Sequence, residues 1–268
     1  APPARRSDGR RRHRGAILER HRTESALDAR PVDALARQAA DAPPTRGFRA
    51  ALDTCDGLGV IAEVKRRSPS KGDLFAGLDP VQLAGDYERG GGTCLSVLTD
   101  TESFGGSPDD LRAARSGCSL PVLRKDFTVA ERDVYDARIM GADAVLLIAA
   151  ALDDAELRAF HALAAELGLD ALVEIHDEDE LERAQAVGAT LIGVNQRDLV
   201  TFEVDHERAV RMAKLFPDDV VSVAESGVRG PDDAAALAAA GYDAVLVGES
   251  LVTSGDPAGA VAALRSAG

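Results

Sequence analysis

The chain has 268 residues, of which 45% are hydrophobic and 28% charged, and its net charge is −14. This size and mixture fit one large α/β barrel or two ordinary domains and exclude wholesale disorder. The longest apolar run, residues 144–152, is far shorter than the roughly 20 residues that span a bilayer, so we expect no membrane segment and a cytoplasmic protein. Cys55, Cys94 and Cys118 lack disulfide or metal-ligand spacing, which fits a reducing compartment.

The first 14 residues hold six arginines and one aspartate, a local charge of +5 that leaves −19 for the rest. They have no apolar residues to pack, and this composition predicts a disordered tail, residues 1–14, ahead of a single domain, residues 15–268. Because the acidic remainder repels polyanions, nucleic-acid binding would rest on the tail alone, and we expect no nucleic-acid partner. Residues 15–42 predict one or two extra helices that either cap the bottom of a barrel or reach its mouth.

Eight β-rich segments follow in the chain. They are GVIAEVK (59–65), GGTCLSVL (91–98), LPVLRKD (120–126), GADAVLLI (141–148), DALVEIH (170–176), GATLIGV (188–194), VVSVAES (220–226) and GYDAVLVG (241–248). Helical patterns such as 153–168, 177–188 and 230–241 lie between them, with Asp or Pro near their starts and Gly at their ends. This alternation predicts an α/β fold, a closed (β/α)8 TIM barrel in preference to an open doubly wound sheet. The dinucleotide-like string Gly57-x-Gly59-x-x-Ala62 runs into a strand and is discarded.

Charged residues share the inward face of several predicted strands. In the first strand Glu63 and Lys65 lie on the same face as Ile61, opposite the apolar residues at 60, 62 and 64. The same alternation places other polar residues inside the barrel, at the carboxyl ends of their strands: Lys125, Glu174, Asn195, Arg197 and Glu225. An unpaired charge there costs several kcal/mol, so the pattern indicates a buried ion-pair network or, because barrel active sites lie at this face, an active site.

Lysine is rare in this chain, and its positions are informative. Against 27 arginines there are four lysines, and Lys65, Lys71 and Lys125 lie in or beside the proposed site. Arginine keeps its proton near neutral pH, whereas a lysine among other cations and low-dielectric walls can be tuned to donate and recover one. Lys65 and Lys125 are therefore candidates for acid–base catalysis.

The last two predicted strands end in small residues, AESGV (224–228) and VLVGES (245–250). TIM barrels often bind phosphate there through backbone N–H groups and a short helix N-terminus, where glycine allows close approach. Gly227 and Gly248, with Ser226 beside them, are candidates for this role. Tight turns without a ligand are the alternative explanation for either glycine.

Seven strings occur in order along the chain: EVKRRSPSKG (63–72), LTDTESFGGSPDDL (98–111), LRKDF (123–127), LVEIH (172–176), IGVNQRDL (192–199), VAESGV (223–228) and VLVGES (245–250). From about residue 44 onward the chain resembles the indole-3-glycerol phosphate synthase family of tryptophan biosynthesis. The resemblance implies a carbon–carbon lyase that closes 1-(2-carboxyphenylamino)-1-deoxyribulose 5-phosphate to indole-3-glycerol phosphate, with loss of CO₂ and water. A related barrel such as phosphoribosylanthranilate isomerase, or a non-catalytic scaffold barrel, should lack part of the set Lys65, Lys125 and Glu174.

The resemblance also implies a role for each catalytic residue. Lys125 would be the general acid that protonates the ribulose carbonyl, and Glu174 the acid–base residue of the later dehydration. Lys65 would hold the substrate carboxylate and itself be able to donate a proton. Glu63 and Asn195 would order the polar cluster. How the proton transfers divide between the two lysines is left open.

The remaining implied contacts bind the substrate. Phe104, Phe127 and Leu199, with Leu146 and Ile148, would wall the aromatic ring. Phosphate would meet Ser68, Gly227, Gly248 and the backbone of Glu249, with Arg197 as a further anion contact and Glu225 and Ser226 completing the substrate-binding set. The family chemistry needs no metal or redox cofactor, and the five histidines lack metal-binding spacing. His176 is interpreted as structural, and the expected assembly is a monomer or weak homodimer, possible partners being other tryptophan-pathway enzymes.

Overall fold

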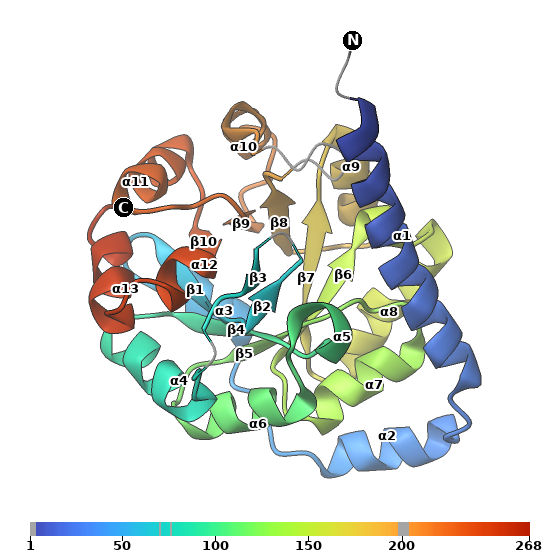
Figure 1. Cartoon of the computed structure of the whole chain (residues 1–268). Coiled ribbons are helices and arrows are strands. Elements are labelled where there is room, and N and C mark those ends of the chain that lie inside the picture. The colour runs from blue at the N-terminus through green and yellow to red at the C-terminus, as the bar shows by residue number, and fades with distance from the viewer. Residues whose placement is uncertain (1–3, 70, 76, 198–203) are drawn as a thin grey trace.

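The computed structural model describes residues 4–69, 71–75, 77–197 and 204–268. Eight parallel strands close into a barrel in the order β1-β10-β9-β8-β7-β6-β5-β4, with helices around it (Figure 1). The barrel strands are β1 (Gly59–Val64), β4 (Cys94–Leu98), β5 (Val122–Lys125), β6 (Ala144–Ile148), β7 (Asp170–Ile175), β8 (Leu191–Asn195), β9 (Val221–Glu225) and β10 (Ala244–Val247). Seven of them lie within a predicted segment, and β8 ends one residue beyond its own, so the (β/α)8 fold is confirmed.

Helices connect successive strands. They are α4 (Pro80–Arg89), α5 (Thr101–Phe104), α6 (Pro108–Ser116), α7 (Glu131–Ile139), the 3-10 helix η1 (Ala149–Ala151), α8 (Asp154–Glu166), α9 (Glu178–Ala186), α10 (His206–Ala213), α11 (Pro231–Ala240), α12 (Glu249–Val252) and α13 (Pro257–Arg265). Side chains of Asp79, Ser107, Asp153 and Asp177 accept hydrogen bonds from first-turn N–H groups of α4, α6, α8 and α9. These caps fix the residue at which each loop ends and its helix begins. The fixed start of the helix in turn helps to set the direction of the strand that follows it.

The alternation of side chains along the strands produces two separate hydrophobic clusters. Ile61, Leu123 and Leu172 belong to a cluster inside the barrel. Val60 and Ala62 belong to a larger cluster between the strands and the helices. The inward direction predicted for the odd-numbered residues of β1 is therefore confirmed, and Glu63 lies inside the barrel, 3% exposed.

The N-terminal helices reach both ends of the barrel. Helix α1 (Ala4–Leu27) runs along the outside of the molecule, on the right in Figure 1, and its Arg20 and His21 contact Asp100, which follows β4 at the mouth. Helix α2 (Val32–Asp41) packs against α7. Helix α3 (Phe48–Asp53) closes the bottom, because Phe48 and Leu52 join the inner cluster. Of the two placements left open for residues 15–42, the mouth is therefore realised by α1, whereas the helix that closes the bottom lies beyond residue 42.

The arginine-rich segment has a helical backbone, because helix α1 begins at Ala4. Arginine is a good helix former, and the segment continues without a break into residues 15–27, which dock on the barrel. The division of the chain into a disordered tail, residues 1–14, and a single domain, residues 15–268, stays a prediction.

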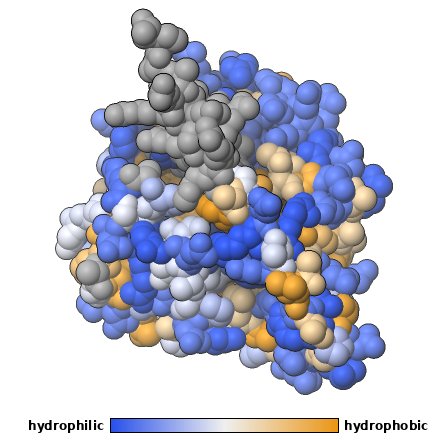
Figure 2. Space-filling model, turned by 45° about the vertical axis from the view of Figure 1, so that its right-hand side comes forward, coloured by the Kyte–Doolittle hydropathy of each residue, from blue (hydrophilic) through white to orange (hydrophobic). Residues whose placement is uncertain are grey.

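The surface of the displayed face is mainly hydrophilic, with smaller hydrophobic groups between the polar ones (Figure 2). The large exposed apolar residues among those described lie on separate elements: Leu27, Phe75, Val81, Val210 and Leu215. Across the described part of the chain, no helix combines the length and apolar character that crossing a membrane requires.

Candidate active site

A cavity of about 880 Å³ lies at the carboxyl ends of the barrel strands. The structure brings most of the predicted site residues to its wall: Glu63, Lys65, Ser68, Phe104, Lys125, Phe127, Leu146, Ile148, Glu174, Asn195, Arg197, Ser226, Gly227, Gly248 and Glu249. Glu225 is buried and does not line the cavity. Leu199 lies outside the described residues. A set of side chains from seven different strands or strand ends thus meets in one place.

Glu63 is the anionic centre of the cavity. Its Oε1 lies 2.9 Å from Lys65 Nζ, and its Oε2 lies 3.2 Å from Lys125 Nζ and accepts a hydrogen bond from Ser96 Oγ at 3.2 Å. Burial by itself raises the pKa of Glu63, but the two ammonium groups more than offset it and lower the pKa to about 2. A side chain at Gly248 would place its Cβ 2.6 Å from Glu63 Oε1, so glycine there makes room for the carboxylate.

Lys125 is surrounded by carboxylates. Burial favours loss of its proton, but Glu63, Glu225 and Glu174 together raise the pKa of Lys125 above its usual range. The shift is opposite to the expected tuning by neighbouring cations, because the charges that act on this lysine are those of the three glutamates. The ammonium form is favoured before substrate binds, which is the form a general acid needs.

Glu174, at the end of β7, is held by Asn195 at the end of β8. Asn195 Nδ2 donates to Glu174 Oε1 at 3.1 Å, and Asn195 Oδ1 accepts from the backbone N–H of Arg197 at 3.0 Å. The amide is thereby oriented from both ends, and the donor group faces the glutamate. The structure brings Asn195 and Arg197 to the cavity as predicted.

Glu225 sits behind the cavity wall without a donor of its own. It is 1% exposed, and neither carboxylate oxygen has a hydrogen-bond donor among the described residues. Burial, and then the charge of Glu174, raise the pKa of Glu225 to about 8 although Lys125 opposes the shift. A Cβ at Gly193 would come within 2.0 Å of Glu225 Oε1, so the glycine inside β8 exists to admit this carboxyl group.

The loops after β9 and β10 form the end of the cavity predicted to hold phosphate. Ser226 and Gly227 both have positive φ, 67° and 75°, so two successive residues are left-handed. Successive N–H groups in such conformations can form an anion-binding concavity. Gly248 precedes the short helix α12. Lys71, from the loop between the hairpin strands β2 (Arg67–Ser68) and β3 (Gly72–Asp73), pairs with Glu249.

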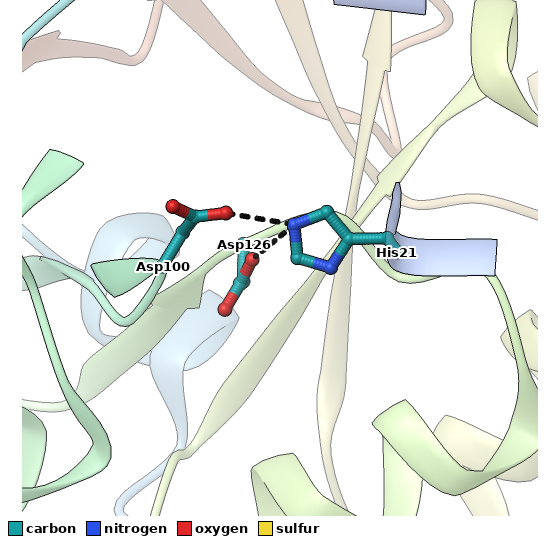
Figure 3. A group of neighbouring side chains, drawn as sticks. All are labelled: His21, Asp100 and Asp126. Carbon is teal, nitrogen blue, oxygen red and sulfur yellow. Dashed lines mark hydrogen bonds and ion pairs between the residues drawn. The ribbon is translucent and has the colours of Figure 1, made fainter. Parts of the chain in front are cut away.

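Helix α1 is fastened to the mouth by His21, which points between two aspartates that follow neighbouring strands (Figure 3). His21 Nε2 lies 2.8 Å from Asp100 Oδ2 and 3.6 Å from Asp126 Oδ1. This trio is a possible metal-ligand group. However, Arg20 pairs with Asp100, and Arg124 lies 3.3 Å from Asp126. Guanidinium groups thus already neutralise both carboxylates, and the trio is better suited to clamping α1 than to binding a metal.

Several cavity residues do not follow from the sequence patterns. Asp100 follows β4 and has the parity of its inward-facing Cys94, so the rule that placed Lys125 could have found it, whereas Asp126 has the opposite parity to Lys125. Ile17 and His206 also line the cavity. Ile17 belongs to a helix without a strand register, and no pattern in the sequence indicates that it reaches the mouth.

Fold and site together define a TIM-barrel enzyme with acid–base groups at one end of its cavity and glycine-containing loops at the other. The chain belongs to the indole-3-glycerol phosphate synthase family, since the family model of that description matches residues 14–264. A protein named indole-3-glycerol phosphate synthase from a Nocardioides species is 54% identical over 245 residues, covering 91% of this chain and 92% of that protein. The resemblance of the seven strings is thus confirmed.

Other relatives agree. Proteins of the same name from Mycolicibacterium smegmatis and, as indole-3-glycerol phosphate synthase 1, from Streptomyces coelicolor are 52% and 53% identical over 237 residues, 88% of this chain and 87% and 88% of theirs. Among solved structures, thiamine phosphate pyrophosphorylase from Pyrococcus furiosus aligns with a TM-score of 0.60 at 17% identity, over 78% of this chain and 95% of that one. That likeness shows the barrel fold alone. The findings support this family and neither the isomerase nor the scaffold alternative.

Proposed function

We propose that the protein is a carboxy-lyase that converts 1-(2-carboxyphenylamino)-1-deoxyribulose 5-phosphate to indole-3-glycerol phosphate in tryptophan biosynthesis. The observation that carries the proposal is the convergence of Lys65, Lys125 and Glu174 on one cavity in a chain of this family. The aromatic carbon that bears the carboxylate attacks the ribulose carbonyl. CO₂ then leaves from that carbon, and the new hydroxyl group leaves as water.

Lys125 supplies the proton for ring closure. Its ammonium form is favoured by the surrounding carboxylates, and its Nζ lies at the cavity wall, where the developing alkoxide would form. Glu63 holds Lys125 and Lys65 on its two carboxylate oxygens, which fixes the two ammonium groups side by side. Lys65 binds the substrate carboxylate by charge and is the second candidate for proton donation in dehydration.

Glu174 serves the dehydration step. As the hydroxyl group departs with a proton, a base must remove a proton from the neighbouring methylene carbon to form the indole double bond. Glu174 lies on the cavity wall in contact with Asn195, which holds the carboxylate in place. Glu225, whose pKa is raised to about 8 by burial and by the charge of Glu174, is mostly protonated behind the wall near neutral pH.

Substrate binding divides between the two ends of the cavity. Phe104 and Phe127 wall the aromatic ring together with Leu146 and Ile148. Phosphate meets Ser68 and the backbone at Ser226, Gly227, Gly248 and Glu249, and Arg197 supplies a further positive charge. The side chain of Glu249 pairs with Lys71, so its contribution to phosphate is the backbone N–H.

The proposal extends to the location, cofactor requirement and partners of the enzyme. We expect a cytoplasmic enzyme that needs no cofactor, because ring closure and dehydration use only proton transfers. The dispersed exposed apolar residues favour a monomer or weak homodimer, with other enzymes of tryptophan biosynthesis as candidate partners. We expect no nucleic-acid or membrane partner.

The test is turnover of the carboxyphenylamino-deoxyribulose phosphate by purified protein, followed by indole fluorescence and by CO₂ release. We expect an indole product without added metal or nucleotide and in the presence of a chelator. Absence of product under these conditions, with folded protein, would overturn the proposal.

A further inference from the structure

His176 connects the proposed dehydration base to a helix on the outside of the barrel. It follows β7, two residues after Glu174, and its side chain is 8% exposed. Its Nδ1 lies 3.0 Å from Glu180 Oε2 in α9, and its Nε2 lies 3.3 Å from Glu174 Oε1. One imidazole ring thus bridges two carboxylates, one in the site and one behind it.

Glu180 is itself fixed. Its Oε2 accepts a second hydrogen bond, from the backbone N–H of His176 at 2.7 Å, and its own N–H donates to the N-cap Asp177 at 2.9 Å. Because an ionised carboxylate only accepts, the hydrogen bond to Glu180 assigns a proton to His176 Nδ1. Glu180 therefore sets both the orientation and the tautomer of the ring.

The other ring nitrogen faces Glu174. Nε2 is buried and, among the described residues, has no hydrogen-bond partner, although it is within ion-pair distance of Glu174 Oε1. If Nε2 lacked a proton, its partial negative charge would lie 3.3 Å from the Glu174 carboxylate, which is unfavourable in a buried place. A proton on Nε2 makes the ring an imidazolium between two carboxylates and turns the same contact into an attraction.

The charges around the two residues agree with this assignment. His176 faces Glu174 from its own strand and Glu180 from α9. Burial opposes protonation, but the two glutamates raise the pKa of His176 to about 9. Glu174 in turn faces Lys125 from β5 and Glu225 from β9. Glu174 is itself buried, so it needs neighbouring cations to stay ionised.

We infer that His176 is a positioning residue for Glu174: anchored by Glu180, its imidazolium keeps the Glu174 carboxylate charged and oriented for proton removal during dehydration. Asn195 and His176 both contact Oε1 of Glu174, so two side chains from different places restrict the rotation of one carboxylate. The inference deepens the proposed function and rests on the acid–base role given there to Glu174. It also replaces the structural interpretation of His176 drawn from the sequence.

The main experiment compares His176→Asn and Glu180→Gln with the unchanged protein. Both substitutions keep polar side chains of similar size but remove the charge from one member of the bridge. We expect kcat at neutral pH to fall about tenfold, the acidic limb of the kcat profile to move to higher pH because Glu174 loses a neighbouring cation, and KM to change little. His161→Asn, a half-buried histidine on α8, is the matched control and should leave the profile in place.

A double-mutant cycle separates the bridge from general loss of packing. If Glu180 acts through His176, Glu180→Gln should have almost no further effect on kcat in the His176→Asn background. Additive effects of the two substitutions would overturn the inference. So would an unshifted pH profile in His176→Asn.

A second measurement does not depend on turnover. NMR titration of labelled imidazole should show His176 losing its proton well above the ordinary value near 6.5, and Glu180→Gln should lower that value. An ordinary titration of His176 would overturn the inference even if the enzyme is active. Failure of the unchanged protein to convert substrate would instead overturn the proposed function and the catalytic role of the bridge, while a high titration would still support the bridge itself.

Discussion

The two ends of the barrel both bury carboxylates, but they treat them differently. At the bottom, Asp143 accepts hydrogen bonds from the backbone N–H groups of Arg46 and Val122, each at 2.7 Å, and pairs with Arg115. Asp170, which is half-buried, and Asp243, which is exposed, also accept from backbone N–H groups, at 2.8 and 2.7 Å. These aspartates join the N-terminal helices, strand starts and loops into one closed network.

At the mouth the carboxylates have few backbone partners and depend on side-chain cations. Glu63 is held by two lysines, Glu174 contacts Asn195 and His176, and Glu225 has no donor among the described residues. Charges satisfied by rigid backbone stabilise the fold, whereas charges facing movable cations and a cavity remain available to substrate. The comparison separates residues that hold the barrel together from residues that react.

The largest effect should follow removal of a cation at the mouth. In Lys125→Ala we expect kcat to fall by about 10³-fold or more because the general acid is lost, with the melting temperature and substrate affinity largely kept. Steady-state kinetics and equilibrium binding measure this. Lys214→Ala, exposed at the end of α10, is the control, and unchanged turnover in Lys125→Ala would remove this residue from the mechanism.

Removal of a carboxylate at the bottom should have the opposite effect, lowering stability while leaving kcat nearly unchanged. Asp143→Ala leaves two backbone N–H groups and Arg115 without their partner, so we expect the free energy of unfolding to drop by about 3 kcal/mol. The kcat of the protein that remains folded should stay near its normal value. Urea unfolding with parallel assays tests this, using exposed Asp109→Ala for comparison; a selective loss of kcat would break the division between the two ends.

The pH dependence of stability at Glu225 gives a further test of the difference between the mouth and the bottom of the barrel. The pKa of Glu225 is about 8 in the folded protein and near 4.3 in the unfolded chain, so the folded state binds more protons between these values. Stability should therefore decrease as pH rises from about 4.3 to 8. Glu225→Gln should remove this contribution and, at pH 8.5, be more stable than the unchanged protein by at least about 1 kcal/mol. Parallel pH dependences of the two proteins in urea unfolding would contradict the raised pKa.

The smallest effect should come from residues that belong to neither end. Deletion of residues 1–14 removes the arginine-rich start of α1 but keeps Ile17 and His21, which reach the cavity. We expect kcat and KM within about twofold of normal, as for most surface changes away from the site. A large loss of activity would show that the arginine-rich segment takes part in catalysis.

Much of the barrel and of its mouth follows from the sequence because the period of a strand fixes which way a residue points. The positions of Glu63, Lys125 and Glu174 could be predicted from two things: their parity along the strand, and the rule that barrel active sites lie at the carboxyl ends of the strands. The same reasoning misses residues that arrive by tertiary contact. His21 reaches Asp100 from a helix outside the barrel, and the partner of His176 depends on where α9 begins. The reason for a glycine at position 193, inside a strand, becomes clear only once the position of the Glu225 carboxyl group is known.

Helix α3, which closes the bottom of the barrel, has a consequence for the order of folding. Phe48 and Leu52 in α3 are synthesised before any barrel strand, yet α3 packs against β4 and β9. Its apolar face thus has no complete binding surface until the seventh barrel strand is synthesised. Docking of α3 therefore belongs to the last stage of folding, and these early-synthesised core residues are among the last to be buried.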